Sequence, residues 1–112
     1  MQKDDVVRLR HMLDAAKEST SFVRNKTRSS LETDRQLVLS LVKSIEIVGE
    51  AAAHVSEKCL RDFPQIPWRD IIGMRNRLIH GYYDIDLDIV WKTVIEDLPP
   101  LIAELEKIIE VK

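Results

Sequence analysis

The stretch LVLSLVKSIEIVGEAAAHV, residues 37–55, decides the fold class because it carries the longest apolar periodicity in the chain. Apolar side chains recur in it every three or four residues, which is the spacing of one face of an α-helix. That stripe consists of Leu37, Leu41, Ile45, Val48, Ala52 and Val55. Four more apolar side chains lie elsewhere around the same helix: Leu39, Val42, Ile47 and Ala51. A helix that is apolar on more than one face lies at the centre of a bundle, or also carries a subunit interface.

The bounds of this central helix follow from its flanking polar residues. Ser30 or Thr33 is expected to cap its N-terminus, with Asp34 favourably placed in the first turn. The helix is expected to continue to about Ser56. Gly49 and the alanine four residues later would let a second helix approach closely, although simple packing of small residues in the core explains Gly49 equally well.

Three further helices are predicted around the central one. The first spans about residues 4–24, where apolar side chains again recur at helical spacing. Another begins with Pro67 at its first position and ends at Gly81. The last starts from a cap at Asp84 or Asp86 and runs toward the C-terminus.

The doubled proline Pro99-Pro100 removes two backbone donors inside the last helical pattern, so a kink or a break is expected there. The number of helices, their lengths and the short connections fit an all-α four-helix bundle. A chain of 112 residues is expected to form a single domain, residues 1–112.

Composition and charge exclude several classes of protein. Hydrophobic residues make up 45% and charged residues 32%, which is typical of a soluble globular protein. The net charge of −2 argues against a protein that coats nucleic acid by bulk charge. The apolar run at residues 37–42 is far shorter than the ~20 residues of a membrane span, and the polar N-terminus is no secretory signal. Cys59 is the only cysteine, so neither an internal disulfide nor a zinc site is expected, and the protein is predicted to be cytoplasmic.

The end of the third predicted helix gathers residues that suit a phosphate flanked by bases. Guanidinium groups bind phosphate bidentately, and aromatic rings stack on bases. Four basic side chains fall within twelve residues and are followed by two tyrosines: Arg69, Arg75, Arg77, His80, Tyr82 and Tyr83. The sequence therefore places a local basic spot in an acidic chain.

RNA cleavage by its own 2′-hydroxyl needs a base, an acid and positive charge for the crowded phosphorane. His80 can serve as base or acid, Arg75 can hold the phosphorane charge, and Asn76 can position a phosphate oxygen or the imidazole. In a regular helix positions 75 and 80 lie about 140° apart, and Arg75 leans toward the apolar side. One histidine also cannot easily act as acid and base together. Two chains that pool their sites across a two-fold axis would resolve both difficulties.

A purely structural explanation accounts for the same residues. Arginines near a helix C-terminus complement its dipole, and a histidine before a terminal glycine is often a cap. Composition and spacing alone leave this the commoner explanation.

The run Arg75-Asn76-Arg77-Leu78-Ile79-His80-Gly81-Tyr82 resembles the signature of the HEPN superfamily, in which four residues separate an arginine from a histidine and one residue separates that histidine from a tyrosine. It is most similar to the HepT-like toxin branch. Segments 45–52, 66–74 and 86–91 also look like that family's segments, in the same order. The resemblance covers roughly residues 4–110.

Membership implies a four- to five-helix HEPN bundle that dimerises with the motif near the dimer cleft. It implies a metal-independent endoribonuclease, the toxin of a type VII-like toxin–antitoxin pair, without a cofactor. Arg75 and His80 would be the catalytic pair and Asn76 the supporting polar residue. Tyr82 would be the site at which a minimal nucleotidyltransferase antitoxin (MntA-like) transfers AMP from ATP.

Two alternatives stay open at this point. One is a non-catalytic nucleotide- or RNA-binding HEPN partner of a nucleotidyltransferase, and the other is a plain helical dimerisation protein. Glu46 and Glu50 fall in one of the family-like segments. Their role is unassigned, and solvated or ion-paired carboxylates are the favoured explanation.

Overall fold

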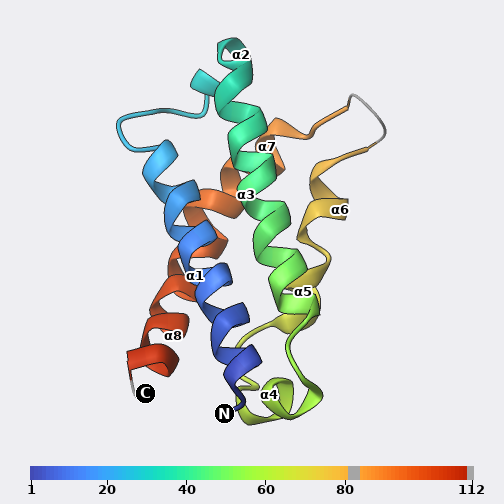
Figure 1. Cartoon of the computed structure of the whole chain (residues 1–112). Helices are drawn as coiled ribbons and strands as arrows, with labels where there is room; N and C mark the ends of the chain where they lie inside the picture. Colours follow the sequence, from blue (N-terminus) through green and yellow to red (C-terminus); the bar gives the residue numbers. More distant parts are fainter. Residues whose placement is uncertain (81–83, 111–112) are drawn as a thin grey trace.

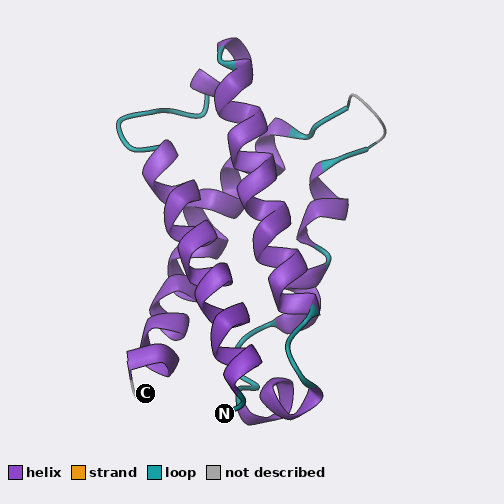
Figure 2. Cartoon of the chain, in the orientation of Figure 1, coloured by secondary structure: helices purple, strands orange, loops and turns teal. Residues whose placement is uncertain are grey.

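A computed structural model describes residues 1–80 and 84–110, and every regular element in that part of the chain is a helix (Figures 1 and 2). The predicted all-α class is therefore confirmed. The elements are α1 (Lys3–Phe22), α2 (Ser30–Thr33), α3 (Arg35–Ala53), α4 (Glu57–Asp62), α5 (Trp68–Ile72), α6 (Met74–Leu78), α7 (Leu87–Lys92), the π-helical segment η1 (Thr93–Asp97) and α8 (Leu98–Glu110). None of the described helices is long and apolar enough to cross a lipid bilayer.

Helix α3 is the central element, as its apolar faces predict. It packs against α1 on one side and against α5, α6 and α7 on the other, while α8 covers α1 (Figure 1). All six residues of the predicted main stripe are buried, and three of them, Leu41, Ile45 and Val48, are completely inaccessible. The four apolar residues predicted elsewhere around this helix differ in their exposure. Val42 and Ala51 are buried, whereas Leu39 is 48% exposed.

The predicted start of the central helix is wrong by a few residues. Asp34 is the N-cap of α3, and its Oδ1 accepts a hydrogen bond from the Leu37 N–H at 3.0 Å. Its backbone (φ −116°, ψ 86°) is not helical, so α2 is a separate short helix before it. Ser30 and Thr33 are the first and last residues of α2 and do not cap the central helix.

The chain leaves α3 at His54 and begins α4, a helix that the periodicity does not predict. Ser56 caps α4 by accepting from the Cys59 N–H at 3.1 Å. The buried Asp5 of α1 accepts from both the backbone N–H and the hydroxyl of Ser56, at 2.8 and 2.7 Å. Six residues are too few to show a helical repeat, so this helix depends on its caps.

Gly49 lets α5 approach α3 closely. A Cβ at this position would lie 3.2 Å from the carbonyl oxygen of Ile71 in α5, closer than ordinary contact. The predicted close approach at Gly49 is thus confirmed, and α6, which follows α5, also packs on α3.

The third predicted helix is two short helices joined at Gly73, and Pro67 is the N-cap of α5 instead of its first residue. Helix α6 ends at Leu78, earlier than the predicted stop at Gly81. Ile79 is extended and forms an isolated antiparallel bridge with Ile85. His80 therefore lies at the base of a hairpin-like connection, and the angle of 140° expected for a continuous helix does not apply.

The last helical segment begins at Asp86, one of the two predicted caps, whose Oδ1 accepts from the Ile89 N–H at 3.1 Å. The irregularity predicted at the prolines lies just before them, in η1. Pro99 and Pro100 occupy the first turn of α8. Leu98 is itself helical (φ −73°, ψ −38°), so α7, η1 and α8 follow one another without a break, and the π-helical segment lies beside the two missing N–H donors.

Candidate functional site

Arg75 and Glu46 form an ion pair between α6 and α3. The Arg75 Nε donates to Glu46 Oε2. The arginine side chain is 51% exposed and the glutamate side chain 20% exposed. The expectation that Arg75 leans into apolar surroundings is wrong, because α6 turns Leu78 into the core and leaves Arg75 at the surface.

His80 and Asp86 form a second pair across the base of the connection between α6 and α7. The His80 Nε2 lies 3.2 Å from Asp86 Oδ2. Backbone hydrogen bonds align the two residues: the His80 N–H donates to the Asp84 carbonyl, and the Asp86 N–H donates to the Leu78 carbonyl, both at 2.7 Å. The hydrogen bond from the Ile89 N–H, followed by the one from His80, lowers the pKa of the Asp86 carboxyl, against the opposing effect of burial.

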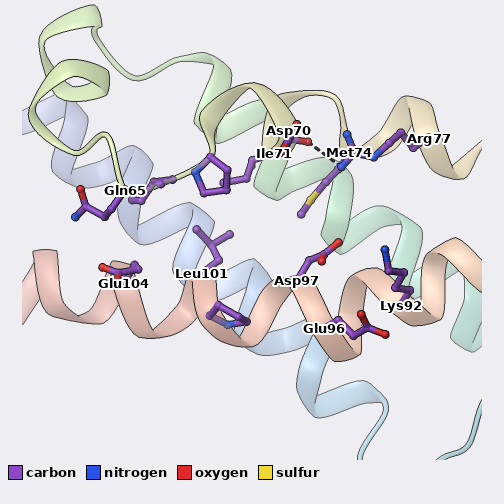
Figure 3. Close-up of a pocket in the computed structure, with 13 residues that line it drawn as sticks. Gln65, Asp70, Ile71, Met74, Arg77, Lys92, Glu96, Asp97, Leu101 and Glu104 are labelled. Carbon is purple, nitrogen blue, oxygen red and sulfur yellow. Dashed lines mark hydrogen bonds between the residues drawn. The ribbon is translucent and has the colours of Figure 1, made fainter.

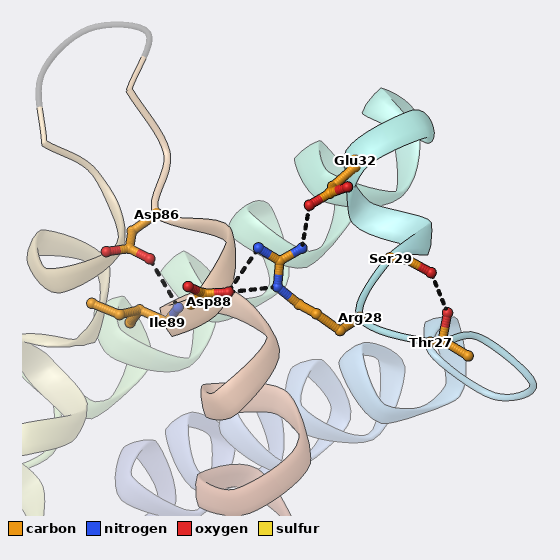
Figure 4. A network of polar contacts seen from close by, with 7 residues as sticks. All are labelled: Thr27, Arg28, Ser29, Glu32, Asp86, Asp88 and Ile89. Carbon is orange, nitrogen blue, oxygen red and sulfur yellow. Dashed lines mark hydrogen bonds and ion pairs between the residues drawn. The ribbon is translucent and has the colours of Figure 1, made fainter.

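A salt bridge at the start of α7 supports this turn. The Nε and Nη2 of Arg28 both lie 2.7 Å from Asp88 Oδ1, and Nη1 lies 3.7 Å from Glu32 Oε1 (Figure 4). Arg28 belongs to the connection between α1 and α2. The N-terminus of α7, including the capping Asp86, is thereby tied to a segment far away in the sequence.

The other two arginines of this basic run, Arg77 and Arg69, have no carboxylate partner among the contacts of the described residues. Arg77 donates from Nη2 to the carbonyl of Asp70 at 3.0 Å. It lines a groove of about 540 Å³ between α5 and α6 on one side and α7, η1 and α8 on the other, together with Lys92 and Asp97 (Figure 3). Arg69 is exposed. Arg75 and His80 are therefore the two basic residues of the motif that the structure pairs with carboxylates.

The remaining predicted site residues have simpler surroundings. Asn76 is exposed on α6, and its backbone N–H donates to the Gly73 carbonyl at 3.1 Å. Tyr82 lies outside the described residues.

In the ranges 1–80 and 84–110, no three His, Cys, Asp or Glu side chains cluster as ligands of a metal ion would. Burial, with Asp5 nearby, raises the pKa of the Cys59 thiol, which fits a reduced core residue.

Sequence reasoning left two carboxylates without a role at the site. Glu46 stands out in the sequence only as part of a segment typical of the family, and its contact with Arg75 confirms the expectation of a solvated or ion-paired carboxylate. The sequence predicts Asp86 only as a helix cap. The spacing of six residues between His80 and Asp86 does not indicate a contact unless the pairing of Ile79 with Ile85 is known.

Comparisons with known proteins agree on one family. The model of the family "Ribonuclease HepT-like" matches residues 12–108, which is most of the chain. "Putative RNase MJ1380" of Methanocaldococcus jannaschii is 32% identical over 107 residues, covering 95% of this chain and 98% of that protein. "Probable ribonuclease HepT" of Thermococcus cleftensis is 39% identical over 75 residues, covering 67% of this chain and 68% of that protein. No solved structure matches significantly.

Proposed function

This chain belongs to the ribonuclease HepT-like family, and on that premise we propose that it is a metal-independent endoribonuclease whose reacting side chains are Arg75 and His80. One observation carries the proposal. Both side chains are 51% exposed, and each is held by a carboxylate from another part of the chain, Glu46 or Asp86. A cation and an imidazole that are held yet accessible suit a bound phosphodiester.

The proposed reaction is an attack by the RNA's own 2′-hydroxyl group on the neighbouring phosphate. The 2′-oxygen attacks the adjacent phosphorus and forms a new P–O bond while its proton passes to a base. The bond to the 5′-oxygen breaks, and that oxygen takes up a proton. The products are a 2′,3′-cyclic phosphate and a 5′-hydroxyl. His80 exchanges a proton in this sequence, and Arg75 stabilises the negative charge of the phosphorane.

The contact with Glu46 leaves Arg75 suited to this role. A guanidinium carries five N–H donors in a planar fork, and Glu46 engages the one on Nε. The four donors on the two terminal nitrogens can then bind two phosphate oxygens. The ion pair orients the side chain without occupying the edge that recognises phosphate.

We further propose that the site works in a homodimer. A single imidazole cannot readily be acid and base in the same step, so a second His80 from another copy would supply the missing group. Two exposed apolar residues belong to the helices that carry this pair or precede it: Leu39, two turns before Glu46 on α3, and Ile72, the last residue of α5. Exposed apolar groups on these helices support a subunit interface there.

Cleavage of RNA in excess EDTA tests this function. We expect the wild-type protein to cut a single-stranded RNA under chelation, and Arg75→Ala to cut about 10²–10³-fold more slowly, the loss typical of one charge-stabilising donor. Arg77→Ala is the matched control, because that guanidinium binds the Asp70 carbonyl and should leave the rate unchanged. Intact RNA that is nevertheless bound by the wild-type protein would instead favour the non-catalytic binding partner.

The toxin–antitoxin role is the remaining part of the proposal. A minimal nucleotidyltransferase is expected to transfer AMP to Tyr82 and thereby add a bulky anion where the substrate phosphate must bind. After incubation with such an enzyme and ATP, mass spectrometry should show added AMP on the wild-type protein and on Tyr83→Phe, but not on Tyr82→Phe. Modification of Tyr82→Phe would move the assignment to another residue.

A further inference from the structure

Asp86 makes two contacts at once. Its Oδ1 accepts from the Ile89 N–H and begins α7, while its Oδ2 lies 3.2 Å from the His80 Nε2. We propose that Asp86 is a positioning residue that fixes His80 in the tautomer with its proton on Nε2, so that Nδ1 exchanges a proton with the RNA. The catalytic part of this inference rests on the proposed function.

The assignment of the proton follows from the chemistry of the partners. A carboxyl that already accepts from a backbone N–H at a helix start favours its ionised form, and the pKa of Asp86 is accordingly lowered. An ionised carboxylate can only accept hydrogen bonds. The nitrogen beside it must therefore donate, which puts the proton of the neutral ring on Nε2 and the lone pair on Nδ1.

Other charged groups near this pair have their own partners or face solvent. Asp88, in the first turn of α7, is bound by Arg28, which also lies near Glu32 (Figure 4). Asp84 is exposed and contributes its backbone carbonyl to the His80 N–H. Asp86 is thus the carboxylate that contacts the imidazole directly among the described residues.

Backbone hydrogen bonds also fix the positions of His80 and Asp86 relative to each other. Ile79 and Ile85 form an antiparallel bridge with a backbone hydrogen bond on each side of it. In one, the His80 N–H donates to the Asp84 carbonyl, and in the other, the Asp86 N–H donates to the Leu78 carbonyl. The capping bond to Ile89 fixes the carboxylate from the opposite side. When Nδ1 accepts a proton, the resulting imidazolium already faces an ionised carboxylate and needs little rearrangement.

The substitution Asp86→Asn distinguishes the proposed control of the His80 tautomer from the role of Asp86 as the cap of α7. Asparagine caps a helix as well as aspartate does, so α7 is expected to keep its start. The amide NH₂, however, would donate to Nε2 and move the ring proton to Nδ1. Asp84→Asn is the matched control, since it removes the same charge beside His80 without altering the partner of the imidazole.

Imidazole ¹⁵N chemical shifts read the tautomer directly, on the full chain and without RNA. We expect Nε2–H for His80 in the wild-type protein and in Asp84→Asn, and Nδ1–H in Asp86→Asn. His54 is an internal reference, because its Nδ1 lies 2.7 Å from the Glu50 carbonyl oxygen and must donate to it. In the cleavage assay, Asp86→Asn should lower kcat about 10²-fold with KM nearly unchanged, as for a base in the wrong tautomer.

The possible results distinguish this inference from the proposed function. An Nδ1–H ring in the wild-type protein, or one that Asp86→Asn leaves unchanged, would overturn the role of Asp86. A tautomer that switches as expected in a protein that never cuts RNA would support the positioning of His80 and overturn the proposed function. If Asp86→Asn fails to fold, Asp86→Ser retains a capping hydroxyl that is too short to reach the imidazole, and His80 should then populate both tautomers.

Discussion

Replacing His80 with alanine is expected to lower the rate of RNA cleavage by about 10²–10⁴-fold, the contribution of a general acid or base. The fold should be retained. The His80 side chain is half exposed and lies outside the helices, and alanine keeps the backbone N–H that binds Asp84. Asp86 would still cap α7. The free energy of unfolding should therefore change by no more than about 0.5 kcal/mol.

The measurement is the initial rate on a defined RNA in EDTA, with thermal unfolding of the same samples. His54→Ala is the matched control, since it removes another exposed imidazole, one that binds the Glu50 carbonyl at the end of α3. It should leave cleavage unchanged. A His80→Ala protein that cuts at nearly the wild-type rate would show that another group moves the proton.

The second large effect concerns stability. Ile45→Ala is expected to lower the free energy of unfolding by about 2–5 kcal/mol. Ile45 is completely buried in α3, the helix against which α1, α5, α6 and α7 pack. Truncating its side chain removes apolar contacts at the centre of the bundle and leaves a cavity that these helices cannot fill together.

Urea unfolding followed by circular dichroism measures this loss. Lys43→Ala, two residues earlier on the exposed side of α3, should change stability by no more than about 0.5 kcal/mol. The slope of the transition should stay the same in both variants if the bundle unfolds in a single step. A loss below about 1 kcal/mol for Ile45→Ala would mean that the core can reorganise around the cavity.

The fold was predictable wherever a helix is long enough to show its repeat. The main stripe from Leu37 to Val55 is buried as expected. The start at Asp34 was not predictable, because several neighbouring polar residues are equally good caps in isolation. The short helices α4, α5 and α6 depend on local caps and on tertiary contacts such as the one between Asp5 and Ser56.

The candidate site was predictable in its residue types but not in its geometry. Spacing and resemblance single out Arg75 and His80, whose catalytic role is still a prediction. The position of His80 at the base of a hairpin-like connection depends on the pairing of Ile79 with Ile85, which no local propensity indicates. Glu46 lies 29 residues before Arg75, so their ion pair follows only from the packing of α6 on α3.

The location of these two carboxylates has a consequence for the order in which a newly made chain matures. Glu46 precedes Arg75 in the sequence, so that pair can form as soon as α6 has been synthesised and has packed on α3. Asp86 follows His80, and α7 and α8 come later still. In a nascent chain, the contact between Arg75 and Glu46 can therefore form before the contact between His80 and Asp86.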